Sequence, residues 1–155
     1  MNSSLNEMLK FGTNGVIGLL ESLTDDEWFI QPEGFANNIA WNAGHLILVR
    51  HNLIYRAAGL DRDLPDDWDG MYKGGTSPAD WDQPHKPADL LAEIKKAHAK
   101  LQKDIESDLF SKQDYHKFDI RGTPIHSIAD GAAFSVWHEG LHLGQMMGIR
   151  DVLRK

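Results

Sequence analysis

The sequence predicts an all-α protein, a four-helix bundle with a long crossover between its second and third helices. Four stretches of helical length repeat apolar residues at spacings of three and four, as amphipathic helices do. The chain has 155 residues and shows no internal repeat or low-complexity tract. A chain of this length buries a core of its own and forms one ordinary domain. We therefore expect a single bundle domain over residues 1–155, with four helices packed together.

The four helical stretches follow from their apolar residues and from signals at their ends. Gly59 follows the second stretch, and glycine suits the left-handed turn past a helix end. Pro87 opens the third stretch, where proline is tolerated at the first helical position. The expected helices are residues 5–23, residues 38–58, residues 87–105, and a last helix that runs almost to residue 155.

The crossover between the second and third helices covers residues 60–86 and carries Trp68, Tyr72 and Trp81. Connections this long inside a compact domain are usually functional or disordered, and three large aromatic residues argue against disorder. We expect this crossover to pack over one end of the bundle.

The segment before the last helix is harder to assign. Residues 115–120 have some strand character, but no second run offers a convincing partner strand. We expect them to be irregular or extended. The last helix then begins either near Thr123 and Pro124 or at Ser127, a residue that can cap a helix.

Composition narrows the classes of function. The formal net charge is −7, and no cluster of Lys and Arg with aromatic residues is present, so nucleic-acid binding is not expected. The absence of cysteine excludes disulfides, thiolate nucleophiles and Cys-type zinc sites. No apolar run approaches the ~20 residues that cross a bilayer, and the N-terminus lacks a basic leader region. We expect a cytoplasmic, unprocessed protein that does not enter a membrane.

Three histidines form the most informative pattern in the sequence. His138 and His142 are four residues apart, which puts both imidazoles on the same side of a helix. His45 lies in the middle of the apolar face of the second helix. Three neutral imidazoles can hold one divalent ion and leave coordination positions open for water or substrate. Imidazole suits zinc, nickel, iron and manganese, so the sequence predicts a metal site without fixing the metal.

The same segment matches the His-Glu-x-x-His pattern of zinc metalloproteases, with Glu139 in the position of the general base. The longer form of that pattern fails, because Gln145 and Gly148 occupy the positions of its glycine and third histidine. Glu139 also projects about 100° away from His138 on a helix. A protease is therefore disfavoured, while Glu139 remains a candidate proton acceptor.

His98 shares the inner face of the third helix with apolar residues. It is a candidate fourth ligand or a group that supports the ligands, although a hydrogen-bonded core histidine is the commoner case. A fourth protein ligand would close the metal site and favour a structural role. The remaining histidines are expected to be solvated: His51, His85, His116 and His126.

The last helix carries Gly140, Gly144 and Gly148 at steps of four residues. A glycine inside a helix costs about 1 kcal/mol relative to alanine, so we expect another backbone to pack closely against this groove. Leu143 and Met147 make the helix apolar on nearly all sides. It is either surrounded within the fold or part of a homodimer interface.

Two segments resemble the DinB/YfiT-like superfamily of metalloenzymes: residues 37–46 (NNIAWNAGHL) and residues 138–145 (HEGLHLGQ). The resemblance covers the chain in helix order and crossover. It implies a four-helix bundle of the DinB/YfiT-like type. It also implies a single divalent metal, most often zinc or nickel, held by His45, His138 and His142.

The resemblance also implies a class of reaction. Some members use the metal to activate a low-molecular-weight thiol for transfer or isomerisation, and the same ion can activate water for hydrolysis. We expect Gln145 and Asn42 to orient water or a small-molecule substrate, and Trp41 and Asn52 to line the pocket with the aromatic crossover. The competing hypothesis is a non-catalytic bundle, stabilised by its metal, that acts as a stress-related binding or interaction protein.

Overall fold

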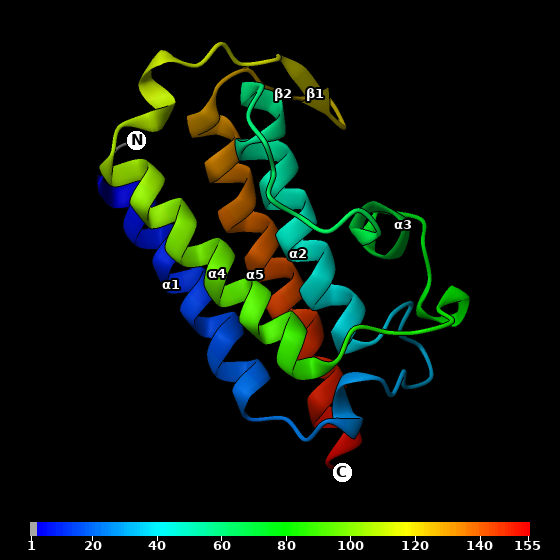
Figure 1. Cartoon of the computed structure of the whole chain (residues 1–155). Helices are drawn as coiled ribbons and strands as arrows, with labels where there is room; N and C mark the ends of the chain where they lie inside the picture. The colour runs from blue at the N-terminus through cyan, green and yellow to red at the C-terminus, as the bar shows by residue number, and fades with distance from the viewer. Residues whose placement is uncertain (1–2) are drawn as a thin grey trace.

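The computed structural model describes residues 3–155, and these residues are mostly helical (Figure 1). The four long helices are α1 (Ser3–Glu21), α2 (Ile39–Ile54), α4 (Pro87–Glu106) and α5 (Ile128–Leu153). The short elements are η1 (Asp26–Trp28), η2 (Arg56–Ala58), α3 (Trp68–Tyr72), η3 (Pro78–Asp80), η4 (Leu109–Lys112), β1 (Phe118–Ile120) and β2 (Thr123–Ile125). The expectation of a mainly α-helical protein is confirmed. Within residues 3–155, no helix combines the length and hydrophobicity that crossing a bilayer requires.

The four long helices lie side by side, and α1 and α2 each pack against both α4 and α5 (Figure 1). The long crossover lets α2 and α4 run in the same direction, while α1 and α5 run the opposite way (Figure 1). The buried apolar side chains of α2 contribute to both core clusters of the protein. Helix α2 is therefore the element around which the others are arranged.

Helix α2 is buried on all sides, because the crossover covers the flank that the long helices leave free. The Trp68 indole N–H donates to the carbonyl oxygen of Gly44 at 3.0 Å, and the Tyr72 ring lies directly over Gly44. The crossover thus packs along the flank of α2 (Figure 1), not over one end of the bundle as the sequence suggested. Trp68 and Tyr72 are buried and Trp81 is partly buried in the same core cluster, which explains why so long a connection is ordered.

A β-hairpin precedes α5: residues 118–120 are extended, one of the two expected states, but the expectation that they have no partner strand was wrong. Strand β1 pairs antiparallel with β2, with Phe118 opposite Ile125 and Ile120 opposite Thr123. The partner strand was missed because it covers one of the two positions proposed for the start of the last helix. The other position, Ser127, is the correct one: its hydroxyl accepts the backbone N–H of Asp130 at 3.1 Å and caps α5.

The glycine groove of α5 is open within the part of the chain that the structure describes. A Cβ added at Gly140 or Gly144 would meet no atom within 4 Å, and at Gly148 it would meet only the Phe35 ring. The expected close backbone is therefore not supplied by another helix of residues 3–155. Leu143 is half-buried against the core, while Met147 on the same helix is exposed.

Two glycine substitutions test how tightly the crossover is packed. An added Cβ at Gly44 would lie 2.4 Å from Cδ1 of the buried Tyr72 ring, so Gly44→Ala must displace α3 and should cost about 1–3 kcal/mol of unfolding free energy. Gly140→Ala is the matched control, because the new methyl group meets nothing and should stabilise the helix by about 1 kcal/mol. Urea denaturation of both variants measures the difference, and equal stabilisation by both would contradict the packing described.

Candidate metal centre

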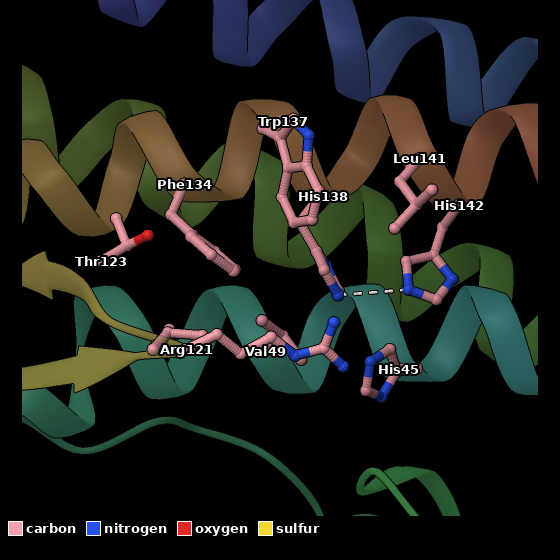
Figure 2. A pocket seen from close by; sticks show the side chains of 10 residues that line it. His45, Val49, Arg121, Thr123, Phe134, Trp137, His138, Leu141 and His142 are labelled. Atoms are coloured by element: carbon pink, nitrogen blue, oxygen red, sulfur yellow. Dashed lines mark hydrogen bonds between the residues drawn. The ribbon is translucent and has the colours of Figure 1, made fainter.

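The structure brings three histidines together between α2 and α5. His45, His138 and His142 each offer a ring nitrogen, and these nitrogens all lie within 4.8 Å of one another. The Nε2 atoms of His138 and His142 are 3.1 Å apart, and Figure 2 shows the three rings converging from two facing helices. All three side chains are less than a tenth exposed. The i, i+4 spacing on α5 and the facing position on α2 together produce this cluster.

Two hydrogen bonds determine which ring nitrogens face the centre. His45 Nδ1–H donates to the backbone oxygen of Tyr72 at 2.7 Å, and His142 Nδ1–H donates to Asn42 Oδ1 at 2.6 Å. The Asn42 amide is itself held, because its NH₂ donates to the carbonyl oxygen of Asn38 at 2.7 Å. Both acceptors require a protonated Nδ1, so each Nε2 presents a lone pair. This is the usual way in which a metal-binding histidine is oriented.

The environment keeps the imidazoles neutral. Burial, together with the neighbouring histidines of the cluster, lowers the pKa of His138 to about 3 and that of His142 to about 4. Burial also lowers the pKa of His45, although its hydrogen bond to Tyr72 opposes this effect. Neutral imidazole is the form that binds metals. The cluster therefore holds its ligands in the binding form near neutral pH.

The donor set fits a divalent transition metal. Nitrogens bound to zinc lie about 2.0–2.1 Å from the ion, so two of them at neighbouring positions are roughly 3 Å apart. The separation of 3.1 Å between His138 Nε2 and His142 Nε2 agrees with this geometry. Two lone pairs facing each other at this distance repel unless a cation or a shared proton lies between them. The residues present can thus hold one metal.

A cavity of about 650 Å³ opens beside the histidine cluster. Ten side chains line it (Figure 2): His45, Val49, Ile120, Arg121, Thr123, Phe134, Trp137, His138, Leu141 and His142. Its walls are mainly apolar, and the residues that line it include no carboxylate. The cluster therefore faces a space large enough for a small organic molecule.

The residues that the β-hairpin adds to this cavity were missed at the sequence level. Ile120, Arg121 and Thr123 reach the wall from a connection, not from a helix face. The available signal was Gly122, which stands between two short runs that contain β-branched and aromatic residues. A two-residue hairpin at Arg121 and Gly122 accounts for this pattern.

Trp41 supports the cluster from behind without lining the cavity. Its ring stacks on the His45 ring, with centroids 4.5 Å apart and an interplanar angle of 14°. Its indole N–H donates to the Thr76 hydroxyl at 2.9 Å, which ties the ring to the crossover. Trp41 thus restricts the motion of His45, a different role from the pocket wall proposed for it.

Glu139 points away from the cavity and into the helical core. Its carboxylate accepts from the Arg50 guanidinium at 2.9 Å and from the Thr13 hydroxyl at 3.1 Å. Glu139 is 4% exposed and Arg50 is 3% exposed. On the far side, Gly12 leaves room for the carboxylate, since a Cβ there would lie 2.8 Å from Glu139 Oε2. The structure therefore places Glu139 in a buried ion pair between α1, α2 and α5.

Two other candidates lie outside the cavity. Gln145 is exposed on α5 and is not among the residues that line the cavity. Asn52 accepts a hydrogen bond from Arg62 at 2.9 Å, so its amide is engaged with the crossover. Asn42 does contact the cluster. Its side chain orients the His142 ring, whereas the sequence suggested that it would orient water or substrate.

The other histidines are separate from the cluster. His98 on α4 does not join the group of three, so the structure shows no fourth histidine in it. His51 is 1% exposed, with its Nδ1 bonded to the backbone oxygen of Arg62, so the expectation that it is solvated was wrong. Burial lowers the pKa of His51 to about 4. His116 and His126 are exposed, as expected.

Comparison with known protein families gives one match. A family model described as the DinB superfamily matches residues 8–146, a range that includes all three clustered histidines. A search of curated proteins finds no match to the chain.

The buried ion pair can be tested by substitution. Arg50→Met leaves the Glu139 carboxylate buried without its partner and should lower the free energy of unfolding by about 3–5 kcal/mol. The double variant Arg50→Met, Glu139→Leu removes both charges and should recover much of that loss. Urea denaturation gives the values. The single variant Glu139→Leu completes the comparison. If the loss in the double variant equalled the sum of the losses in Arg50→Met and Glu139→Leu, the charges would not be coupled.

The orienting role of Asn42 predicts a specific effect on metal affinity. Asn42→Ala removes the acceptor of His142 Nδ1–H and should weaken zinc binding about 10- to 100-fold, as loss of such supporting groups typically does. Asn52→Ala is the matched control. It removes a side-chain amide from the same helix, but this amide contacts Arg62 and not a histidine of the cluster. Competition with a chromophoric zinc chelator measures both affinities. Equal affinities in the two variants would contradict the assignment.

Proposed function

The chain belongs to the DinB superfamily, and from that premise we propose that it is a metal-dependent enzyme that acts on a small molecule. In this proposal it has the four-helix bundle of the DinB/YfiT-like type. The observation that carries the proposal is the convergence of three neutral imidazoles on a cavity of about 650 Å³. The histidines would hold one divalent ion, with zinc or nickel favoured over iron and manganese.

The chain's own residues prepare the centre. When bound, the ion supplies Lewis-acid activation of a thiol or of water. His45, His138 and His142 would hold it, and the hydrogen bonds that His45 and His142 donate to Tyr72 and Asn42 keep these two rings in the productive tautomer. The walls beside the histidines are mainly apolar, so a substrate that fills the cavity would displace water from the centre and strengthen electrostatic interactions there.

Transfer of a low-molecular-weight thiol to an organic acceptor is the reaction that we favour. The cavity volume suits a small organic molecule, and apolar surfaces such as Phe134, Trp137 and Leu141 suit its carbon skeleton. Hydrolysis is the second candidate, because the same ion could activate water. Neither reaction assigns a catalytic role to Glu139, whose carboxylate is engaged by Arg50.

A non-catalytic, metal-stabilised bundle is the competing function. A structural zinc site normally has four protein ligands and no open position. The cluster in residues 3–155 contains three histidines, and His98, the proposed fourth ligand, is not part of it. The adjoining cavity supports the catalytic alternative, since substrate could reach the ligands from that side.

Metal analysis tests the proposal directly. Tag-free protein should bind about one transition metal per chain, and the variant with His45, His138 and His142 changed to alanine should bind none while keeping its helical circular dichroism. His116→Ala is the control, because it removes an exposed imidazole outside the cluster. Metal retained by the triple variant, or wild-type protein that stays metal-free after incubation with zinc, nickel and manganese, would overturn the metal site. Thiol-transfer and hydrolysis assays with the bound metal then separate the two reactions.

A further inference from the structure

Arg121 sits at the tip of the β-hairpin and lines the same cavity as the three histidines. Figure 2 shows its side chain extending from the hairpin toward His45 and His138. The hairpin is anchored at its base by Ile125, which is buried in the core, and an exposed contact joins His126 Nε2 to Asp119 Oδ1 at 3.3 Å. The position of Arg121 therefore follows from an anchored element.

The backbone at Arg121 is unfavourable for an arginine. Its φ is +49° and that of Gly122 is +80°, the values of a two-residue hairpin turn that twists with its strands. Asn or Gly normally occupies the first position of such a turn, because a long side chain disfavours the left-handed conformation. A residue held in this conformation against its preference points to a function for its side chain.

The Arg121 guanidinium has no partner within the residues that the structure describes, where it makes no hydrogen bond and no ion pair. The cavity wall contains no carboxylate. Asp119, two residues earlier, is engaged by His126. Arg121 is exposed, and what sets it apart from other unpaired cations is its place in the wall of the cavity beside the three histidines.

We propose that Arg121 binds the carboxylate of an organic acid, which makes anionic small molecules the preferred substrates of this cavity. The guanidinium offers paired N–H donors that match the two oxygens of a carboxylate. The apolar part of the acid would lie on Phe134, Trp137 and Leu141, with its reactive group toward the histidines. This inference rests on the proposed function, because it takes the bound acid to be the substrate of the metal centre.

The test compares an acid with its neutral analogue. Calorimetric titration with 3-phenylpropanoate and 3-phenylpropanamide, on metal-free and zinc-loaded protein, gives the preference for the charged ligand. The wild type should bind the acid at least tenfold more tightly than the amide. Arg121→Asn should abolish this preference, and Arg121→Lys should retain part of it, because lysine keeps the charge but not the paired donors.

Two features of the design protect this comparison. Asn suits the turn, so Arg121→Asn should melt at or above the temperature of the wild type, and its loss of binding would not reflect unfolding. Lys117→Gln removes an exposed positive charge from the same segment outside the cavity and should leave the preference unchanged. A loss of preference in Lys117→Gln equal to that in Arg121→Asn would overturn the specific role of Arg121.

The outcomes separate this inference from the proposed function. An acid preference that persists in Arg121→Asn would overturn the inference. If the same protein still binds zinc, the proposed metal centre is unaffected by that result. An Arg121-dependent preference in a protein that binds no metal would support the anion site while overturning the proposed enzyme. An Arg121-dependent preference together with one zinc per chain supports both.

Discussion

The enclosure of helix α2 is the constraint on which the rest of the structure depends. Fourteen of its sixteen residues are buried, and they include Asn42, His45 and Arg50. A buried polar group is costly unless it is hydrogen-bonded, so each of these side chains needs a partner from a neighbouring element. Asn42 bonds to His142, His45 to the backbone of Tyr72, and Arg50 to Glu139. The hydrogen bonds to the buried polar side chains of α2 therefore position the crossover, α5 and the histidine cluster together.

Helix α5 divides its polar residues between two neighbouring regions. His138 and His142 face α2 and the cavity, while Glu139 lies on the adjacent face and reaches Arg50 and Thr13 in the core. This division explains why a His-Glu-x-x-His sequence need not form a protease site. A general base must lie within reach of the water that it activates, and Glu139 is instead engaged in a buried ion pair.

The helices and the three histidines could be predicted because periodicity reports which residues share a helix face. The same helical projection misplaced Gln145 and Asn52. The angle of a residue around the helix axis does not show which element packs against that residue at its position along the helix. Gln145 is exposed on α5, and Asn52 accepts a hydrogen bond from Arg62 of the crossover. The hairpin was missed because two strands of three residues are too short to show a period. His51 was assigned to solvent because the crossover that buries it has no helical period of its own.

The cavity is lined by residues from two helices and from the hairpin, and this arrangement affects substrate specificity. The three clustered histidines lie on α2 and α5, whose positions are set by core packing. The residues at the mouth, Ile120, Arg121 and Thr123, belong to a hairpin whose tip can change without disturbing that packing. Binding residues are often carried on connections that a rigid scaffold positions. Proteins with the same three-histidine arrangement can therefore differ in substrate through the hairpin, and Arg121 is the residue through which this chain would select an anionic one.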